Sequence, residues 1–261
     1  MSLLVLLMGL CVGILVGLFG IGGGLVLVPA LVYLLGMEQH MAQGTSLFIL
    51  LPPLGIGALV AYWKRGYVDL RVGILCALGM LLGSYAGSLI AMPIGSMQLK
   101  GAFGCFLMIS AALLWRKTRQ QPAAPDLQSF TVTSSPPSLL WQLGILAVAG
   151  VCGIAAGLFG AGGGVLLVPF LGLLFDFEQL HAQGTSLIAL VPPTGALAVL
   201  SYWHAGKVSG HIGLLLMPGI FLGGIAGSRL ADMLQPRKMR QIFAAVILAL
   251  GAWEAYSGWF S

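Results

Sequence analysis

The same glycine-rich run occurs twice in this chain, each time inside an apolar stretch. GLFGIGGGLVLVP covers residues 17–29 and GLFGAGGGVLLVP covers residues 157–169. Glycine is a poor residue for a helix interior, where it costs about 1 kcal/mol relative to alanine. The proline that follows each run, Pro29 or Pro169, is tolerated in a first helical turn. The pattern therefore predicts a break in the chain and the start of a new helix at two matching places.

Few charged side chains are available to cover a water-facing surface. The 261 residues are 59% apolar and 7% charged, and the mean hydropathy is +1.01. Soluble domains carry about 25% charged residues. Apolar stretches long enough to cross a bilayer recur along the chain, which predicts an all-α membrane protein that crosses several times. The net charge of +5 comes from loop residues, as orientation signals do, and does not indicate nucleic acid as a partner.

The chain is an internal duplication. Segments 17–88 and 157–228 align without a gap at a constant offset of 140 residues, and the shared positions include AQGTSL, PP-x-G and YW-x-x-G-x-V. A chance similarity between apolar stretches would not align the prolines and the polar residues. We therefore predict two homologous halves, 1–115 and 138–261, joined by a polar linker over residues 116–137.

The paired GLFG-x-GGG and QGTS motifs resemble those of the sulfite exporter TauE/SafE family of bacterial membrane transporters. The resemblance covers nearly the whole chain apart from the linker. It implies a multi-pass protein of the bacterial inner membrane that moves a small sulfur-containing anion, such as sulfite or a sulfonate. It also makes the proton a candidate coupling ion, and it leaves open which anion is moved and in which direction.

Each half contains about five apolar segments, and the second of them is short. Segments 21–36 and 161–176 would span only about 24 Å as helices, so they either cross or re-enter. If all five cross, the halves are inverted repeats with eight to ten helices in total, and the basic residues divide ten against two. If the second segment re-enters, they divide seven against five, so the positive-inside rule favours inversion, a cytoplasmic linker and external termini. The ten are Lys64, Arg65, Arg71, Arg116, Lys117, Arg119, Arg229, Arg237, Lys238 and Arg240, and the two are Lys100 and Lys207.

The triple glycines are candidates for binding an anion. Transporters built from inverted repeats bind their substrates at discontinuous segments in matching positions of both halves. Backbone N–H groups at a helix N-terminus favour an anion. The alternative is close helix packing, which the spacing of Gly219, Gly223 and Gly227 indicates more clearly than a site. The predicted cradle residues are Gly22, Gly23, Gly24, Gly162, Gly163 and Gly164.

The QGTS motifs place polar side chains at the start of a long apolar segment. A small oxyanion would accept hydrogen bonds from them, whereas helix capping by Thr or Ser is the alternative. The proline pairs that follow, beginning at Pro52 and Pro192, are expected to break each helix. The predicted substrate-binding side chains are Gln43, Thr45, Ser46, Gln183, Thr185 and Ser186.

The remaining residues point away from an enzyme. Glu38 and Glu178 are expected to be solvated loop residues rather than proton carriers, and the YW pairs at 62–63 and 202–203 are expected at the membrane surface. The sequence contains no catalytic triad, metal-binding cysteine pair or Walker motif, and no cofactor is predicted. The prediction is a secondary transporter of a small sulfur-containing anion that works by alternating access. An anion channel and a non-transporting sensor or accessory protein are the alternatives, and the oligomeric state stays open.

Overall fold

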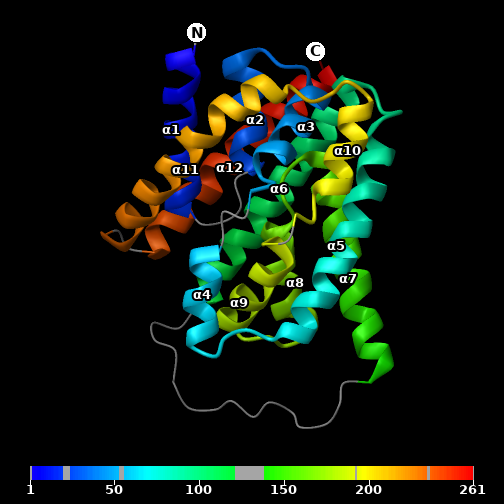
Figure 1. The fold of residues 1–261 in the computed structure, drawn as a ribbon, viewed down its shortest axis with the longest axis vertical. Coiled ribbons are helices and arrows are strands. Elements are labelled where there is room, and N and C mark those ends of the chain that lie inside the picture. Colours follow the sequence, from blue (N-terminus) through cyan, green and yellow to red (C-terminus); the bar gives the residue numbers. More distant parts are fainter. Residues whose placement is uncertain are drawn as a thin grey trace.

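The fold consists of helices joined by short connections (Figure 1). The computed structural model describes residues 2–19, 24–52, 56–120, 138–191, 193–233 and 236–260, and these contain twelve helices and no strand. The helices are α1 (Ser2–Phe19), α2 (Gly24–Leu35), α3 (Gln39–Ile49), α4 (Ile56–Lys64), α5 (Leu70–Ala91), α6 (Ser96–Gln120), α7 (Leu139–Phe159), α8 (Gly164–Leu174), α9 (Gln179–Leu190), α10 (Ala196–His204), α11 (Gly210–Met233) and α12 (Pro236–Phe260).

Each half contributes six helices, α1–α6 and α7–α12, where about five segments were expected. The difference arises because the third segment of each half is divided at its proline pair. In the first half α3 ends at Ile49 and α4 begins at Ile56, and in the second half α9 ends at Leu190 and α10 begins at Ala196. Proline removes a helical hydrogen bond and its ring clashes with the preceding turn. The predicted breaks are therefore confirmed, and they raise the helix count to twelve.

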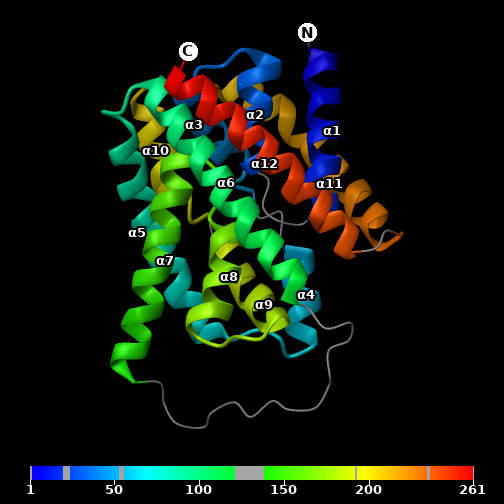
Figure 2. The same ribbon diagram turned by 180° about the vertical axis from the view of Figure 1, so that it is seen from behind.

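The three most extensive contacts between the two halves are helix pairs. The α1 helix packs on α11, α5 packs on α7, and α6 packs on α12. By the repeat offset, α1 corresponds to α7 and α5 corresponds to α11. The α1–α11 pair and the α7–α5 pair are therefore equivalent contacts, one formed by each pair of corresponding helices. Corresponding helices run in opposite directions: α1 begins at the top of Figure 1 and α7 begins at the bottom, while α6 and α12 lie antiparallel in Figure 2.

Glycine stripes allow these helices to approach closely. A Cβ atom added at Gly219, Gly223 or Gly227 of α11 would collide with the backbone of α1. In the same way, Cβ atoms at Gly83 and Gly87 of α5 would collide with the backbone of α7. Small residues are what helix packing in a membrane uses, since backbones must come near for van der Waals contact. The packing role expected for the α11 glycines is confirmed.

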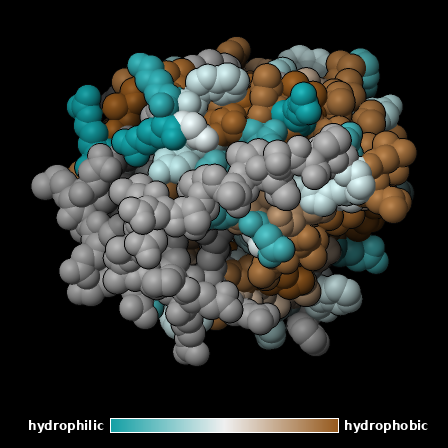
Figure 3. Space-filling model, turned by 90° about the horizontal axis from the view of Figure 1, so that it is seen from below, coloured by the Kyte–Doolittle hydropathy of each residue, from teal (hydrophilic) through white to brown (hydrophobic). Residues whose placement is uncertain are grey.

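Five of the described helices are long and apolar enough to cross a membrane: α5, α6, α7, α11 and α12. The shorter apolar helices are the Val5–Leu18 part of α1 and the whole of α2. With 12 residues, α2 spans about 18 Å, less than the thickness of the hydrocarbon core. Many large apolar side chains are exposed on the long helices, and brown hydrophobic surface lies beside hydrophilic residues in Figure 3. The protein is an all-α, multi-pass membrane protein.

Candidate functional site

The glycine runs lie at helix starts, as the sequence predicts. The helix α2 begins at Gly24 and α8 begins at Gly164. In the second half the break is made by left-handed glycines, Gly160 with φ 68° at the end of α7 and Gly162 with φ 59°. Glycine adopts this conformation without the steric cost that a Cβ imposes. Gly163 then precedes α8, and the Gly164 N–H donates to the Gly162 carbonyl at 2.6 Å.

The glycine segments of the two halves touch each other. A Cβ at Gly24 would overlap the backbone of Gly160 and Ala161, and a Cβ at Gly160 would lie 2.7 Å from the Cα atom of Gln43. Close packing therefore accounts for Gly24 and Gly160, whereas backbone conformation accounts for Gly162. The first-half residues Gly22 and Gly23 lie outside the described residues. The two glycine segments and one QGTS motif thus meet at the contact between the halves.

The two threonines of the QGTS motifs join one half to the other. The Oγ1 atom of Thr45 accepts a hydrogen bond from the backbone N–H of Ser209 at 2.9 Å, just before α11. In the matching place, Thr185 accepts from the N–H of Asp69 at 3.0 Å, just before α5. Both threonines are 0% exposed. Neither caps its own helix, because α3 and α9 begin six residues earlier and have Glu38 and Glu178 at their N-caps, so the capping interpretation is wrong.

The two glutamines make a second matched pair of contacts between the halves. The Oε1 atom of Gln43 lies 3.3 Å from the hydroxyl of Tyr202, and the Oε1 atom of Gln183 lies 3.1 Å from the hydroxyl of Tyr62. The Tyr202 hydroxyl also lies 3.1 Å from the Gly157 carbonyl oxygen. The glutamine of each QGTS motif therefore contacts the tyrosine of the YW-x-x-G-x-V motif in the other half.

The two serines of the motifs make different contacts. Ser46 donates to the carbonyl of Gly160 at 2.8 Å, across the two halves. Ser186 donates to the carbonyl of Gln183 at 2.8 Å, within its own helix. The symmetry of the two motifs is therefore incomplete, and only the first motif contacts the described glycine segment through its serine.

The amide nitrogen of Gln43 is buried without a partner among the described residues, as is that of Gln39 at the start of α3. Gln43 is 0% exposed, and its Nε2 atom has no hydrogen-bond partner among the described residues. Buried polar groups are nearly always paired, and an orphan of this kind needs an explanation. It carries two N–H donors and belongs to the residue that packs against Gly160. The arrangement can offer hydrogen bonds to an acceptor, together with the N-terminus of α8.

The loop carboxylates lie where the sequence predicts, although one of them is not simply solvated. Glu38 accepts from the Lys207 ammonium at 2.7 Å and from the Ser96 hydroxyl at 2.6 Å. These hydrogen bonds, led by the one from Lys207, lower the pKa of Glu38 below its ordinary value. The buried His40 lies 3.0 Å from the same serine hydroxyl. In the second half, Glu178 is exposed.

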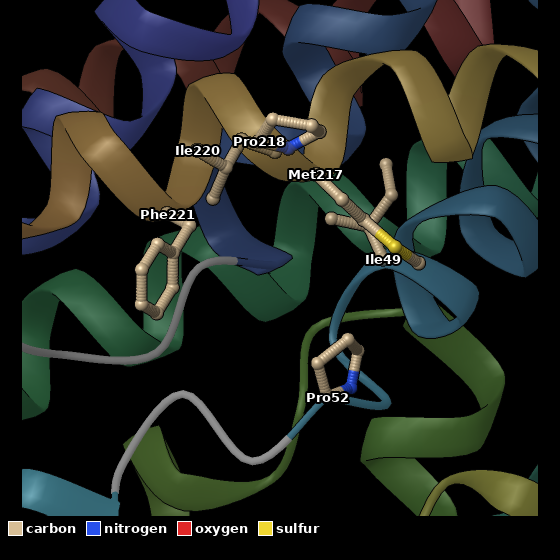
Figure 4. A pocket seen from close by; sticks show the side chains of 6 residues that line it. All are labelled: Ile49, Pro52, Met217, Pro218, Ile220 and Phe221. Carbon is tan, nitrogen blue, oxygen red and sulfur yellow. The ribbon is translucent and has the colours of Figure 1, made fainter.

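An apolar hollow of about 240 Å³ lies beside the broken end of α3 (Figure 4). Pro52 lies below it, where the chain leaves α3, and Pro218 lies above it on α11. An anion would find no hydrogen-bond donor among its side chains. The hollow is therefore not the predicted anion site. Its lining residues are Ile49, Pro52, Met217, Pro218, Ile220 and Phe221.

Two tyrosines differ from their predicted places at the membrane surface, and one glutamate is buried that no sequence motif marks. Trp63 and Trp203 are each 51% exposed, whereas Tyr202 is fully buried and the Tyr62 hydroxyl donates to a glutamine of the other half. The repetition of the tyrosine within YW-x-x-G-x-V was the available signal. The glutamate is Glu254 of α12, which is 0% exposed and has Leu114 at the matching position of the first half.

Comparison with known proteins is consistent with this architecture. Residues 5–253 match the family model described as Sulfite exporter TauE/SafE. The chain is 31% identical over 277 residues to the probable membrane transporter protein YunE of Bacillus subtilis, with all of both chains covered. It is 30% identical to a probable membrane transporter protein of Xylella fastidiosa strain Temecula1, covering 96% of this chain and 93% of that one.

A more distant relative comes from an archaeon. The probable membrane transporter protein MJ0441 of Methanocaldococcus jannaschii is 25% identical, over 95% of this chain and 93% of its own length. No solved structure matches the chain. The family match spans both halves and the glycine and QGTS motifs in each. This multi-pass membrane protein therefore belongs to the sulfite exporter TauE/SafE family.

Proposed function

We propose that this chain is a secondary transporter of a small sulfur-containing anion, such as sulfite or a sulfonate, in the bacterial inner membrane. Its family and the names of its relatives, probable membrane transporter proteins, support a membrane transporter. The family description, sulfite exporter, supports the class of substrate. Alternating access between the two halves is the proposed mechanism.

The observation that carries the choice of an anion is the buried, unpaired amide nitrogen of Gln43. It lies on the residue that contacts Gly160, where the chain turns toward the N-terminus of α8. The N-terminal end of a helix carries partial positive charge and unpaired N–H groups. Sulfite and sulfonates present several acceptor oxygens to such donors. We assign the contact to the Gln43 amide and to the backbone N–H groups of Gly162 and Gly163, because the Gly164 N–H is already paired with the Gly162 carbonyl.

The architecture supports motion of one half against the other. The proposed site draws on residues of both halves, and each half contains a divided helix, α3/α4 or α9/α10, at the matching place. The opposite directions of α1 and α7 in Figure 1 support an inverted repeat. Transporters of this architecture bind near the membrane midplane at such discontinuities and expose the site to each side in turn.

The proposed orientation places the linker in the cytoplasm and both termini outside. Helix α4, which ends in Lys64, points to the bottom of Figure 1, whereas α10 and α11, which flank Lys207, meet near the top with both termini. The α4–α5 connection, which carries Lys64 and Arg65, therefore lies at the end away from the termini. The positive-inside rule assigns that end to the cytoplasm.

Purified protein in vesicles tests the class of activity. Vesicles loaded with sulfite, thiosulfate or methanesulfonate are diluted into the labelled form of the same anion. A carrier gives saturable exchange that is accelerated by anion on the opposite side. Flux without saturation or exchange would identify a channel, and binding without flux would identify a sensor.

A matched pair of variants tests the site. Gln43→Leu and Gln183→Leu each remove one hydrogen bond to a tyrosine of the other half, so their structural effects are comparable. Only Gln43→Leu also removes the buried unpaired donors. Loss of a hydrogen bond to a charged group costs about 1.5–3 kcal/mol, so we expect anion affinity to fall about tenfold or more for Gln43→Leu alone. Equal losses in both variants would remove the support for this site.

A further inference from the structure

One carboxylate of the described residues is fully buried, and it lies inside a candidate membrane span. Glu254 is 0% exposed on α12, within the span Gln241–Trp259. Neither of its carboxylate oxygens has a hydrogen-bond partner among the described residues. An ionisable side chain at such a position is costly to maintain, and in transporters it marks ion or proton pathways.

The packing of α12 on α6 explains how the side chain becomes buried. Gly251, Ala255 and Gly258 lie on the same face of α12 as Glu254, at helical spacings of three and four residues. A Cβ added at Gly251 or Gly258 would collide with the backbone of α6, and one at Gly104 of α6 would collide with Ala255. This contact joins the last helix of one half to the last helix of the other (Figure 2). Glu254 therefore faces the contact between halves rather than lipid.

Two polar side chains face the carboxyl group from the neighbouring helices. They are the hydroxyl of Tyr33 on α2 and the ammonium of Lys100 in the second turn of α6. The Lys100 ammonium lies over the ring of Tyr33, 5.0 Å from its centroid. No ion pair between Lys100 and Glu254 is formed within 4 Å in the described residues. Lys100 is flexible enough to leave the ring and approach the carboxylate.

We propose that Glu254 binds and releases one proton in each transport cycle. With Lys100 on the Tyr33 ring, no cation is paired with the buried carboxyl group, and it holds the proton. In a state that brings Lys100 onto the carboxylate, the ion pair replaces the proton, which leaves to water. One O–H bond is made and broken, and no other bond changes. Because residue 114 is leucine, the duplication supplies one such site and not two.

The site lies close to one end of the membrane span. Trp259, where the span ends, follows Glu254 by five residues, or about 8 Å of helix. The C-terminal end of α12 lies at the same end of the molecule as the N-terminus of the chain, at the top of Figure 1. Exchange of the proton with water is therefore expected at the end that carries both termini, and a rearrangement of α6 against α12 would couple it to the other half.

The test rests on the proposed transport function but has one readout that does not. Vesicles carry labelled methanesulfonate, which has no proton to lose near neutral pH, and a pH-sensitive dye reports proton movement. We expect wild-type protein to accumulate the anion when a pH gradient is imposed. Glu254→Gln should keep exchange of the anion but lose the pH-driven accumulation at least tenfold. Glu178→Gln, at an exposed loop carboxylate, is the matched control and should behave as wild type.

Infrared spectroscopy of the purified protein follows the carboxyl group itself. A protonated-carboxyl C=O band that is present in wild type, absent in Glu254→Gln and lost on raising the pH would support the proposal. No such band at any pH, or pH-driven accumulation that persists in Glu254→Gln, would overturn it. If wild type moves no anion, the transport function fails instead, and the infrared band alone then decides whether Glu254 binds a proton.

Discussion

Replacing Thr45 with valine tests the hydrogen bond that joins α3 to the start of α11. Thr45 is 0% exposed, and its hydroxyl accepts from the N–H of the half-buried Ser209 at 2.9 Å. Valine keeps the shape of the side chain and removes the acceptor. A buried donor left unpaired costs about 1–3 kcal/mol. Because water reaches part of Ser209, we expect the lower part of that range, about 1–2 kcal/mol.

Equilibrium unfolding in mixed detergent micelles measures this loss. Thr185→Val removes the matching bond to Asp69 and should cost about the same. The two bonds share no residue, so the double variant should lose about 2–4 kcal/mol in total. Thr194→Val is the control, because this buried threonine contacts the other half through its backbone carbonyl, which accepts from Ser84 at 2.7 Å.

Two results would refute this reasoning. If Thr45→Val unfolds like wild type, the hydroxyl does not hold the two halves together. If it unfolds like wild type and also loses affinity for sulfite in vesicles, the hydroxyl contacts the substrate, as the motif alone suggested. A loss of stability with unchanged affinity would assign Thr45 to the contact between the halves.

Three further outcomes are expected. Gly160→Ala should destabilise the protein by more than Gly206→Ala in unfolding measurements. Both glycines have φ 68°, which costs alanine about 1–2 kcal/mol at either position. Only the Cβ at Gly160 would in addition collide with neighbouring atoms. Because the pKa of Glu38 is lowered in the folded protein, its ion pair with Lys207 stabilises the fold at neutral pH, by about 0.5 kcal/mol for an exposed pair. This contribution should disappear as the pH falls through the lowered pKa. Lys207→Met should remove most of that pH dependence of the unfolding free energy. A cysteine at Ser129 should react with a membrane-impermeant thiol reagent only from the cytoplasmic side, and labelling from outside would reverse the proposed orientation.

The sequence predicted those features of the fold that depend on composition or on a few neighbouring residues. The low content of charge indicated a membrane protein, and the constant repeat offset indicated two halves. The breaks before Gly24 and Gly164 and after Ile49 and Leu190 follow from glycine and proline chemistry. Each of these breaks is a local backbone property, which can be predicted without knowing what packs nearby.

The partners of the polar side chains could not be predicted in this way. Thr45 bonds to a residue 164 positions away, and Gln43 bonds to one 159 positions away. The motif showed that both need a partner in an apolar segment, and it was equally compatible with a helix cap or an anion. In the folded protein the packing of the two halves brings the start of α11 against Thr45, so the partner of Thr45 is a backbone N–H. The same packing leaves the Gln43 nitrogen without a partner among the described residues.

By itself, the sequence determined that the chain is a duplicated, helical membrane protein with matched breaks at glycine and proline, because composition and local backbone preference are written in neighbouring residues. Only the tertiary structure decided which polar groups are satisfied and which are buried without a partner. Glu254 shows the difference most clearly, since it lies near the end of the chain among Trp253, Tyr256 and Trp259 and looks like a surface residue. It is buried because glycines on its face of α12 let α6 approach closely, and such an approach depends on helices that are far apart along the chain.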